Sequence, residues 1–213
     1  MIPNRPFRLR PASARDKLLE AAVRLVRTQG FSATGVEQLC AEAGVTKGAF
    51  FHHFASKEQL GIAAAQYWST STSEFFASAP FHHEAEPAAR VLGYIDLRIA
   101  LISGPAESFS CVAGTMLQES FASSPAIRDA CAASIDANAR ALEDDIAAAL
   151  APRGLVEPAA ASLARHIQTV IQGAFVTAKA LPPEAAAPAA RESLGHLRRY
   201  LELLFTKESA DAR

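Results

Sequence analysis

The sequence has few cysteines, no long hydrophobic run and no motif that would mark a catalytic centre. Its three cysteines lie far apart, at positions 40, 111 and 131, which is typical of free thiols in a reducing compartment and excludes a CxxC pair. The longest apolar stretches fall short of the roughly 20 residues that a membrane-spanning helix needs. Three arginines between residues 5 and 10 have no apolar run directly after them, so a secretory signal is not expected. These absences predict a cytoplasmic protein without a membrane segment.

The sequence also lacks the patterns of the common enzyme classes. It contains no GxSxG, no Walker-type phosphate loop and no HExxH, which are the spacings that nucleophilic, phosphate-binding and zinc-dependent sites require. The one dense polar cluster, His82, His83, Glu84 and Glu86, lies beside prolines, where a solvated loop is favoured over a metal site. We therefore expect no enzymatic activity, no cofactor and no metal.

The charge distribution divides the chain into two parts. Hydrophobic residues make up 50% and charged residues 20% of the sequence, which is typical of a folded chain with a large core. Residues 1–57 hold nine Lys or Arg against four Asp or Glu, a net charge of +5, and the overall charge of -1 leaves -6 for the remainder. This asymmetry favours a polyanionic partner for the N-terminal part, although a solvated basic face would give the same count.

The spacing of apolar residues is helical throughout, so the sequence predicts an all-α fold. Ser13 with Asp16 and Thr34 with Glu37 have the spacing of helix-capping pairs, and Thr46 can cap a third helix. We expect helices at 13–29, from Thr34 to Gly44, from Thr46 to His53, and at 57–79, 86–103, 108–122, 125–152, 157–181 and 186–207, about nine in all. Prolines and glycines separate the later helices.

The two short helices joined at Gly44 have the form of a helix-turn-helix, which places its second helix in the major groove of DNA. Residues 44–54 (GVTKGAFFHHF) and 56–60 (SKEQL) closely resemble the DNA-binding signature of the TetR/AcrR family, in register from residue 13 to about residue 60. The resemblance implies a DNA-binding domain over residues 1–57 and a helical ligand-binding and dimerisation domain over residues 58–213. It also implies a regulator, by analogy a repressor, that binds a palindromic double-stranded operator as a homodimer and is released by a small-molecule effector.

Within the helix-turn-helix, the residue types indicate which side chains are core and which contact DNA. Phe50 and Phe54 are spaced to face inward and hold the helix angle. Lys47, in the first turn of the recognition helix, is the best candidate for reading bases. Phe51 stands where the family usually has tyrosine, so a hydroxyl contact with phosphate is lost here. The expected DNA-binding residues are Thr34, Thr46, Lys47, Gly48, Phe51, His52, His53 and Lys57.

The remaining helices carry aromatic and isolated polar residues that could line a cavity for a hydrophobic or aromatic effector, although an aromatic stripe is also ordinary core. The expected ligand-binding residues are Tyr67, Trp68, Tyr94, Arg98, Phe109, Cys111, Met116, Phe121, Asn138, His166 and Gln172. Two apolar stripes near the C-terminus could pack internally or join two copies, and the resemblance favours a dimer. The expected dimer residues are Ile167, Ile171, Phe175, Leu194, Leu197, Leu201 and Leu204.

Two alternatives stay open at this point. Cys111 begins an expected helix, where a thiolate is favoured, so the chain could instead sense electrophiles or oxidants through this thiol. A DNA-binding protein without any effector is the other alternative, and it predicts a solid C-terminal domain with no cavity.

Overall fold

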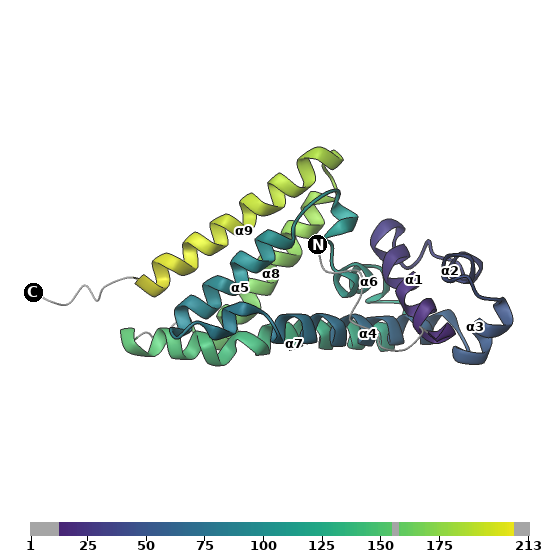
Figure 1. The fold of residues 1–213 in the computed structure, drawn as a ribbon, viewed down its shortest axis with the longest axis horizontal. Coiled ribbons are helices and arrows are strands. Elements are labelled where there is room, and N and C mark those ends of the chain that lie inside the picture. Colours follow the sequence, from purple (N-terminus) through teal and green to yellow (C-terminus); the bar gives the residue numbers. More distant parts are fainter. Residues whose placement is uncertain (1–12, 155–157, 207–213) are drawn as a thin grey trace, which may run out of the picture. The chain divides into compact units, whose positions relative to one another are not determined.

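A computed structural model describes residues 13–154 and 158–206, and over these ranges the chain is helical and contains no strand (Figure 1). The predicted all-α fold is confirmed. The α-helices are α1 (Ala14–Gln29), α2 (Val36–Ala43), α3 (Lys47–His53), α4 (Lys57–Ala77), α5 (Pro87–Leu101), α6 (Val112–Ser120), α7 (Pro125–Leu150), α8 (Ala160–Ala178) and α9 (Pro183–Thr206). Three 3-10 helices accompany them: η1 (Pro80–His83), η2 (Ala106–Ser108) and η3 (Ala151–Arg153). The arginines at positions 5, 8 and 10 and the expected helix ends at 157 and 207 lie outside the described residues.

Both ends of the first helix follow the signals predicted from the sequence. The Asp16 amide donates to the Ser13 hydroxyl at 3.1 Å, and the Ser13 amide donates to the Asp16 carboxylate at 3.2 Å. Helix α1 therefore begins with the reciprocal capping box that was predicted. Its end is also as predicted, because Gly30 takes a φ of 88°, which other residues rarely adopt.

Several helix starts differ from the prediction. Gly35, rather than Thr34, precedes α2, and its amide donates to the Gln38 side chain at 2.9 Å. Helix α6 begins at Val112, after η2 and with Cys111 as its N-cap, and not at residue 108 as expected. Helix α9 begins at Pro183, three residues earlier than expected, since a proline in the first turn lacks only an N–H group that no helical carbonyl would accept.

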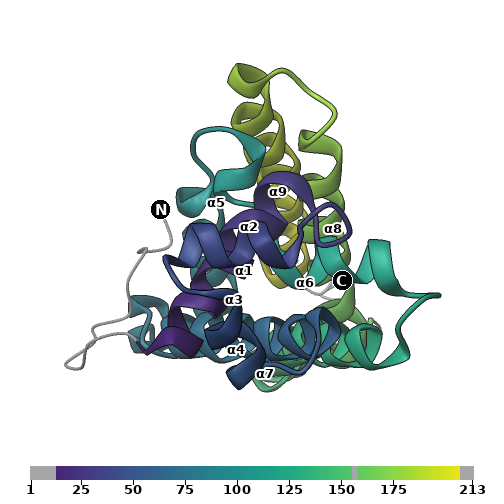
Figure 2. The ribbon, with the colours of Figure 1, turned by 90° about the vertical axis from the view of Figure 1, so that its right-hand side faces the viewer.

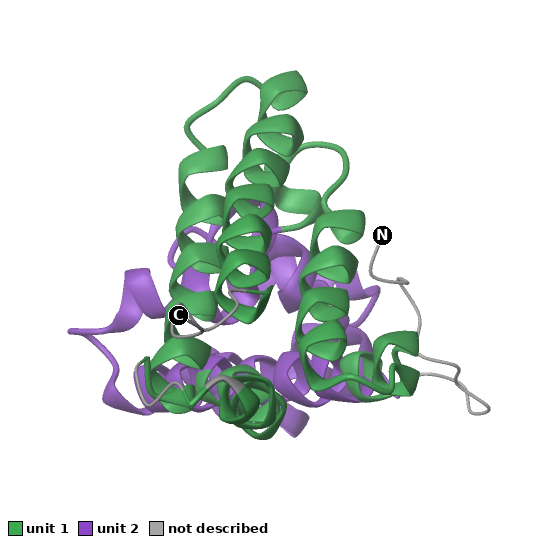
Figure 3. Cartoon of the chain, turned by 90° about the vertical axis from the view of Figure 1, so that its left-hand side faces the viewer, with its two compact units in different colours: residues 1–2, 75–109, 136–213 green, residues 3–74, 110–135 purple. Residues whose placement is uncertain are grey.

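By contacts, the described residues form two compact units, coloured separately in Figure 3. One unit comprises residues 13–74 and 110–135, and the other comprises residues 75–109, 136–154 and 158–206. Helix α6 and the start of α7 therefore cluster with the first helices, although their segment begins only at residue 110, well beyond the expected domain boundary at residue 57. That boundary stays a prediction about function, and contacts divide the chain differently.

In the first unit, α1, α2 and α3 lie against one another (Figure 2) around a small apolar core. Leu18, Leu19, Leu39 and Phe50 have almost no exposed surface, and Leu60 at the start of α4 closes the cluster. Each such side chain stabilises the fold by roughly 1.5–3 kcal/mol on burial. The orientation of α3 relative to α1 and α2 is therefore fixed by packing.

In the second unit, α5, α8 and α9 run side by side (Figure 1). Helix α9 buries Leu194, Leu197 and Leu201 inside this unit. The Arg191 guanidinium donates to the carbonyl oxygen of Ile102 at 2.7 Å. This bond satisfies a carbonyl at the C-terminal end of α5 that has no helical partner, so it ties α9 to α5.

Candidate nucleic-acid interface

The turn between α2 and α3 positions the first residues of α3. Gly44 ends α2 with a φ of 62°, in the left-handed region, and no atom lies within 4 Å of where its Cβ would be. The glycine is therefore required by conformation and not by crowding. The Ala49 amide donates to the Thr46 hydroxyl at 3.1 Å, so the predicted cap of α3 is confirmed.

Two phenylalanines anchor α3 from below, as predicted. Phe50 is fully buried and Phe54 nearly so, with their ring centroids 6.0 Å apart. The Arg15 guanidinium of α1 lies 5.6 Å from the centroid of the Phe54 ring. The opposite face of α3 is consequently the face left to solvent.

That outer face presents most of the residues expected to contact DNA. Thr46, Lys47, Gly48 and His52 are exposed, and Phe51 is 51% exposed although its ring edge packs on Phe50. His53 is half-buried, with its ring 4.9 Å from that of His52. The N-terminal turn of α3 is thus open to a large partner, and the individual DNA contacts stay predictions.

Lys47 forms an ion pair with Glu37, and a phosphate or base of DNA could take the place of Glu37. Its Nζ lies 3.1 Å from the Glu37 carboxylate, and the two side chains are 59% and 85% exposed. Exposed pairs of this kind contribute at most about 1 kcal/mol. Exchanging Glu37 for an acceptor on DNA therefore costs little.

The predicted role of Thr34 is wrong. Its side chain is buried, and its hydroxyl donates to the Gly30 carbonyl oxygen at 2.6 Å. The Gln29 amide donates to the same hydroxyl oxygen at 3.3 Å. Thr34 cannot donate to a phosphate in this conformation, because its hydrogen already closes the turn after α1.

Lys57, at the start of α4, is held by the same turn. Its Nζ donates to the Ser32 carbonyl oxygen at 3.2 Å and lies 4.6 Å from the centroid of the Phe31 ring. Burial lowers the pKa of Lys57, and the negative charge of Glu119 opposes this shift. A phosphate contact by Lys57 stays a prediction, and it would require the amine to leave or share the Ser32 carbonyl.

Glu119, on α6, is a residue that sequence reasoning missed. Its carboxylate accepts a hydrogen bond from the Ser32 amide at 2.7 Å and lies against Gly30. Glycine at position 30 is required by its backbone angle, because a side chain there would only displace the flexible end of Glu119. A second bond joins the Ser124 hydroxyl to the Glu58 carboxylate at 2.5 Å. These bonds connect residues 87 and 66 positions apart, a separation at which no sequence pattern gives a signal.

The expected ligand-binding residues do not form one cluster. Tyr67, Trp68, Cys111 and Met116 belong to the first unit together with Phe121. The predicted position of Phe121 in a cavity is wrong, because its side chain is 62% exposed. Trp68 and Met116 are buried, and the Arg27 guanidinium lies 5.6 Å from the centroid of the Trp68 ring.

In the second unit, the structure brings Tyr94 and Arg98 together. The buried Tyr94 hydroxyl accepts from the Arg98 Nε at 2.9 Å and from the Gln168 amide at 3.1 Å. The Arg98 guanidinium also lies 4.1 Å from the centroid of the Phe76 ring. Gln172 was expected among the ligand-binding residues, whereas the glutamine that contacts Tyr94 is Gln168, one helical turn earlier on α8.

The other expected ligand residues of this unit lie elsewhere in it. Phe109 is buried, with its ring 5.6 Å from that of Phe175, and Asn138 on α7 is half-buried. His166 is exposed, with its ring 6.0 Å from that of Tyr200, so its predicted place in a buried cavity is wrong. His166 lies on the exposed face of α8, whereas most of the apolar residues of this helix lie on its buried face.

The expected dimer residues are also largely wrong, because a single chain already buries them. The stripes of α8 and α9 face the core of their own unit, and Leu204 alone is half-buried. The buried residues are Ile167, Ile171, Phe175, Leu194, Leu197 and Leu201. The large apolar side chains left exposed on these helices are Val176, Tyr200 and Leu203.

The described residues contain no group of three or more His, Cys, Asp or Glu side chains that could hold a metal ion. Over the same residues, no helix has both the length and the apolar character needed to cross a bilayer. His82 and His83 lie in η1, whose one buried side chain is Phe81.

Two family models match this chain. Residues 18–64 match a model described as bacterial regulatory proteins, tetR family. Residues 87–186 match a model described as transcriptional regulator LmrA/YxaF-like, C-terminal domain. The first match covers α1 to α3 with the start of α4, and the second covers α5 to the start of α9.

Similar proteins agree with these matches. The HTH-type transcriptional regulator LmrA of Bacillus subtilis is 46% identical over 52 residues, which is 24% of this chain and 28% of LmrA. The HTH-type transcriptional repressor KstR2 of Mycolicibacterium smegmatis is 42% identical over 60 residues, 28% of each chain. The chain thus matches less than a third of the length of either curated relative. A solved structure of a TetR family transcriptional regulator from Agrobacterium tumefaciens superposes with a TM-score of 0.74 over 91% of this chain and 98% of the other, at 19% identity, which shows a shared fold.

Proposed function

Because this chain belongs to the TetR family of bacterial regulatory proteins, we propose that it is a DNA-binding transcriptional regulator that acts as a repressor in the cytoplasm. The observation that carries this proposal is the exposed N-terminal turn of α3. Thr46 caps that turn, Phe50 and Phe54 hold it from beneath, and Lys47 projects from it. Repression is proposed by analogy with KstR2, a transcriptional repressor that is 42% identical over 60 residues.

The proposed contact with DNA begins at the capped end of α3. The free amides of a helix N-terminus attract phosphate, and Gly48 lets the backbone approach closely. Lys47 would exchange Glu37 for an acceptor on a base edge or a phosphate. Phe51 would pack its ring against sugar or a thymine methyl group. Contacts to phosphate would fix the register, and Lys47 would supply sequence preference.

We propose that two copies assemble through the outer faces of α8 and α9. Val176, Tyr200 and Leu203 are exposed there, and outside the adjoining helix backbone no atom of the described residues lies within 4 Å of a Cβ at Gly173 or Gly195. Glycine inside a helix costs about 1 kcal/mol relative to alanine, so two glycines on open faces are explained by close approach of a second copy. A two-fold dimer would present two α3 helices about 35 Å apart, the spacing of successive major grooves.

Regulation by a small molecule would act through a difference in affinity between DNA-competent and DNA-incompetent states. Cys111 is a second candidate for the sensing group, because its sulfur accepts from the Gly114 amide at 3.4 Å at the start of α6. If Cys111→Ser keeps the wild-type response of DNA binding to an electrophile, the thiol does not act as the sensor.

The proposed function is tested by selecting bound duplexes from a random pool with the full chain. We expect enrichment of a palindrome, and we expect binding of the selected duplex to weaken steeply as salt rises. Recovery of no preferred sequence would contradict the proposal. A preferred sequence without two-fold symmetry would contradict its dimeric part alone.

A further inference from the structure

A groove of about 520 Å³ lies within the second unit, between η1, α5 and α9. Its volume is in the range of sites that take small molecules, roughly 300–1,000 Å³. Phe81, Leu92 and Leu97 contribute apolar walls, and Glu84, Asp96 and Arg198 contribute charged groups. None of the ligand-binding residues predicted from the sequence lines it.

The apolar wall of the groove is held in place by close packing of η1 on α5. A Cβ at Gly93 would lie 2.7 Å from the Cβ of Phe81, so the glycine lets Phe81 approach the helix. The Phe81 ring then packs edge-on against the ring of Tyr94, with centroids 5.9 Å apart. Since Phe81 as a whole is only 8% exposed, its position is set before any ligand arrives.

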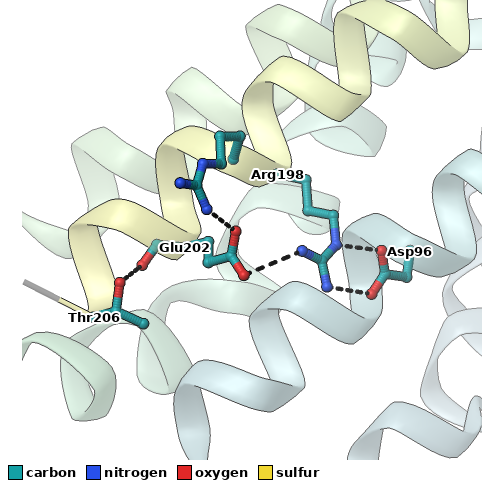
Figure 4. Close-up of polar contacts among 5 residues, drawn as sticks. Asp96, Arg198, Glu202 and Thr206 are labelled. Carbon is teal, nitrogen blue, oxygen red and sulfur yellow. Dashed lines mark hydrogen bonds and ion pairs between the residues drawn. The ribbon is translucent and has the colours of Figure 1, made fainter.

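The one cation of the groove is already satisfied. Arg198 donates from Nε and Nη2 to the two oxygens of Asp96, at 2.6 and 3.2 Å, and its Nη1 lies 3.8 Å from Glu202 (Figure 4). The hydrogen bond that Arg198 donates to Asp96 raises the pKa of Arg198. Every nitrogen of this guanidinium therefore faces a carboxylate, and little of its positive charge is left for an anionic ligand.

Glu84, in contrast, has no cation of its own within the described ranges. Its amide donates to the Phe81 carbonyl oxygen at 3.2 Å, and its carbonyl oxygen accepts from Arg90 at 2.9 Å. The backbone is thus fixed, while the carboxylate remains free. The two carboxylates and one guanidinium give the lining a formal charge of -1.

We propose that this groove binds a small organic cation with an apolar body. The ammonium group would lie against the carboxylate of Glu84, and the apolar body would lie along Leu92 and Leu97. The inference rests on the proposed function only in naming this ligand as the effector, since binding itself requires no DNA. An anion would meet the unpaired carboxylate and a saturated arginine, so it is disfavoured.

The test compares three probes of similar size on the full chain by ligand-observed NMR titration: benzyltrimethylammonium, its neutral carbon isostere neopentylbenzene, and phenylacetate. We expect the cation to bind most tightly. Glu84→Gln should weaken the cation by roughly threefold to tenfold, which is what loss of an exposed charge pair allows. Glu107→Gln, which alters an exposed carboxylate of the same unit outside the groove, should leave it unchanged.

A second variant is expected to change the cation affinity in the opposite direction. Arg198→Met frees the Asp96 carboxylate and should tighten cation binding, while thermal unfolding shows whether the variant is folded. Should Arg198→Met unfold, Glu84→Lys replaces it and is expected to abolish cation binding. The proposal is overturned if the isostere binds as well as the cation, if Glu84→Gln has no effect, if phenylacetate binds through Arg198, or if no probe binds.

DNA binding is measured separately with the selected duplex, with and without the cation. If the cation binds but leaves the DNA affinity unchanged, the groove is a cation-binding site but not the effector site. Absence of DNA binding would contradict the proposed function and leave the titration of the groove interpretable.

Discussion

Replacing Glu119 tests whether α6 is fastened to the turn that precedes α2. The Ser32 amide donates to this carboxylate at 2.7 Å, and a hydrogen bond to a charged group contributes about 1.5–3 kcal/mol. Because Glu119 is itself exposed, the lower end of that range applies. Glu119→Ala removes the acceptor and should lower the free energy of unfolding by about 1.5 kcal/mol, whereas Glu119→Gln keeps an acceptor oxygen and should cost about half as much.

Urea unfolding followed by circular dichroism measures these differences. Glu74→Gln is the matched control, since Glu74 is exposed and belongs to the same unit. A second readout is the pKa of Lys57, which burial lowers and Glu119 partly restores. Both Glu119 variants should lower that pKa further. Unfolding curves indistinguishable from those of the control, or a rise in the pKa of Lys57, would refute the reasoning.

Substitutions at two buried side chains, Phe50 and Cys131, and at the exposed Gly173 give further tests. Phe50→Ala should destabilise the chain by about 3–5 kcal/mol and abolish DNA binding, which calorimetry and gel shift can check; a loss below 1 kcal/mol would contradict its core role. Burial raises the pKa of Cys131 to about 12, above its ordinary 9.0. The neutral thiol therefore contributes fully to the free energy of unfolding below pH 9, and this contribution is lost as the pH rises toward 12. Cys131→Ala should therefore flatten the fall in stability over that window, by at most about 4 kcal/mol, in urea titrations at a series of pH values. Gly173→Ala should raise monomer stability by up to about 1 kcal/mol, whereas Gly173→Arg should shift sedimentation toward monomer; a dimer unchanged by arginine would place the interface elsewhere.

The sequence predicted what short-range signals encode. Ser13, Thr46 and Gly44 have local geometric roles, so the ends of α1, α2 and α3 followed from them within a residue or two. The inward spacing of Phe50 and Phe54 likewise identified the core beneath α3. Thr34 failed because a threonine before a helix can cap it or close the previous turn, and only the fold decides between these roles.

What the sequence could not predict depends on which face of a helix meets which neighbour. The stripes of α8 and α9 were interpreted as a surface between copies, yet Ile167 and Leu201 are buried by their own chain. An apolar stripe predicts that a helix face is covered, but it does not indicate which part of the molecule covers it. Glu119 and Arg198 act across long separations, on Ser32 and Asp96 respectively. Contacts of this kind appear only once the helices are placed.

The measurement that tests the central claim most directly is the salt dependence of DNA binding by the wild type and Lys47→Met. Fluorescence anisotropy with the selected duplex gives the slope of log K against log salt. Wild type should show a steep slope, and Lys47→Met should weaken binding and make the slope shallower by about one for each half-site. Equal affinities and equal slopes for the two proteins would contradict the placement of α3 in the major groove.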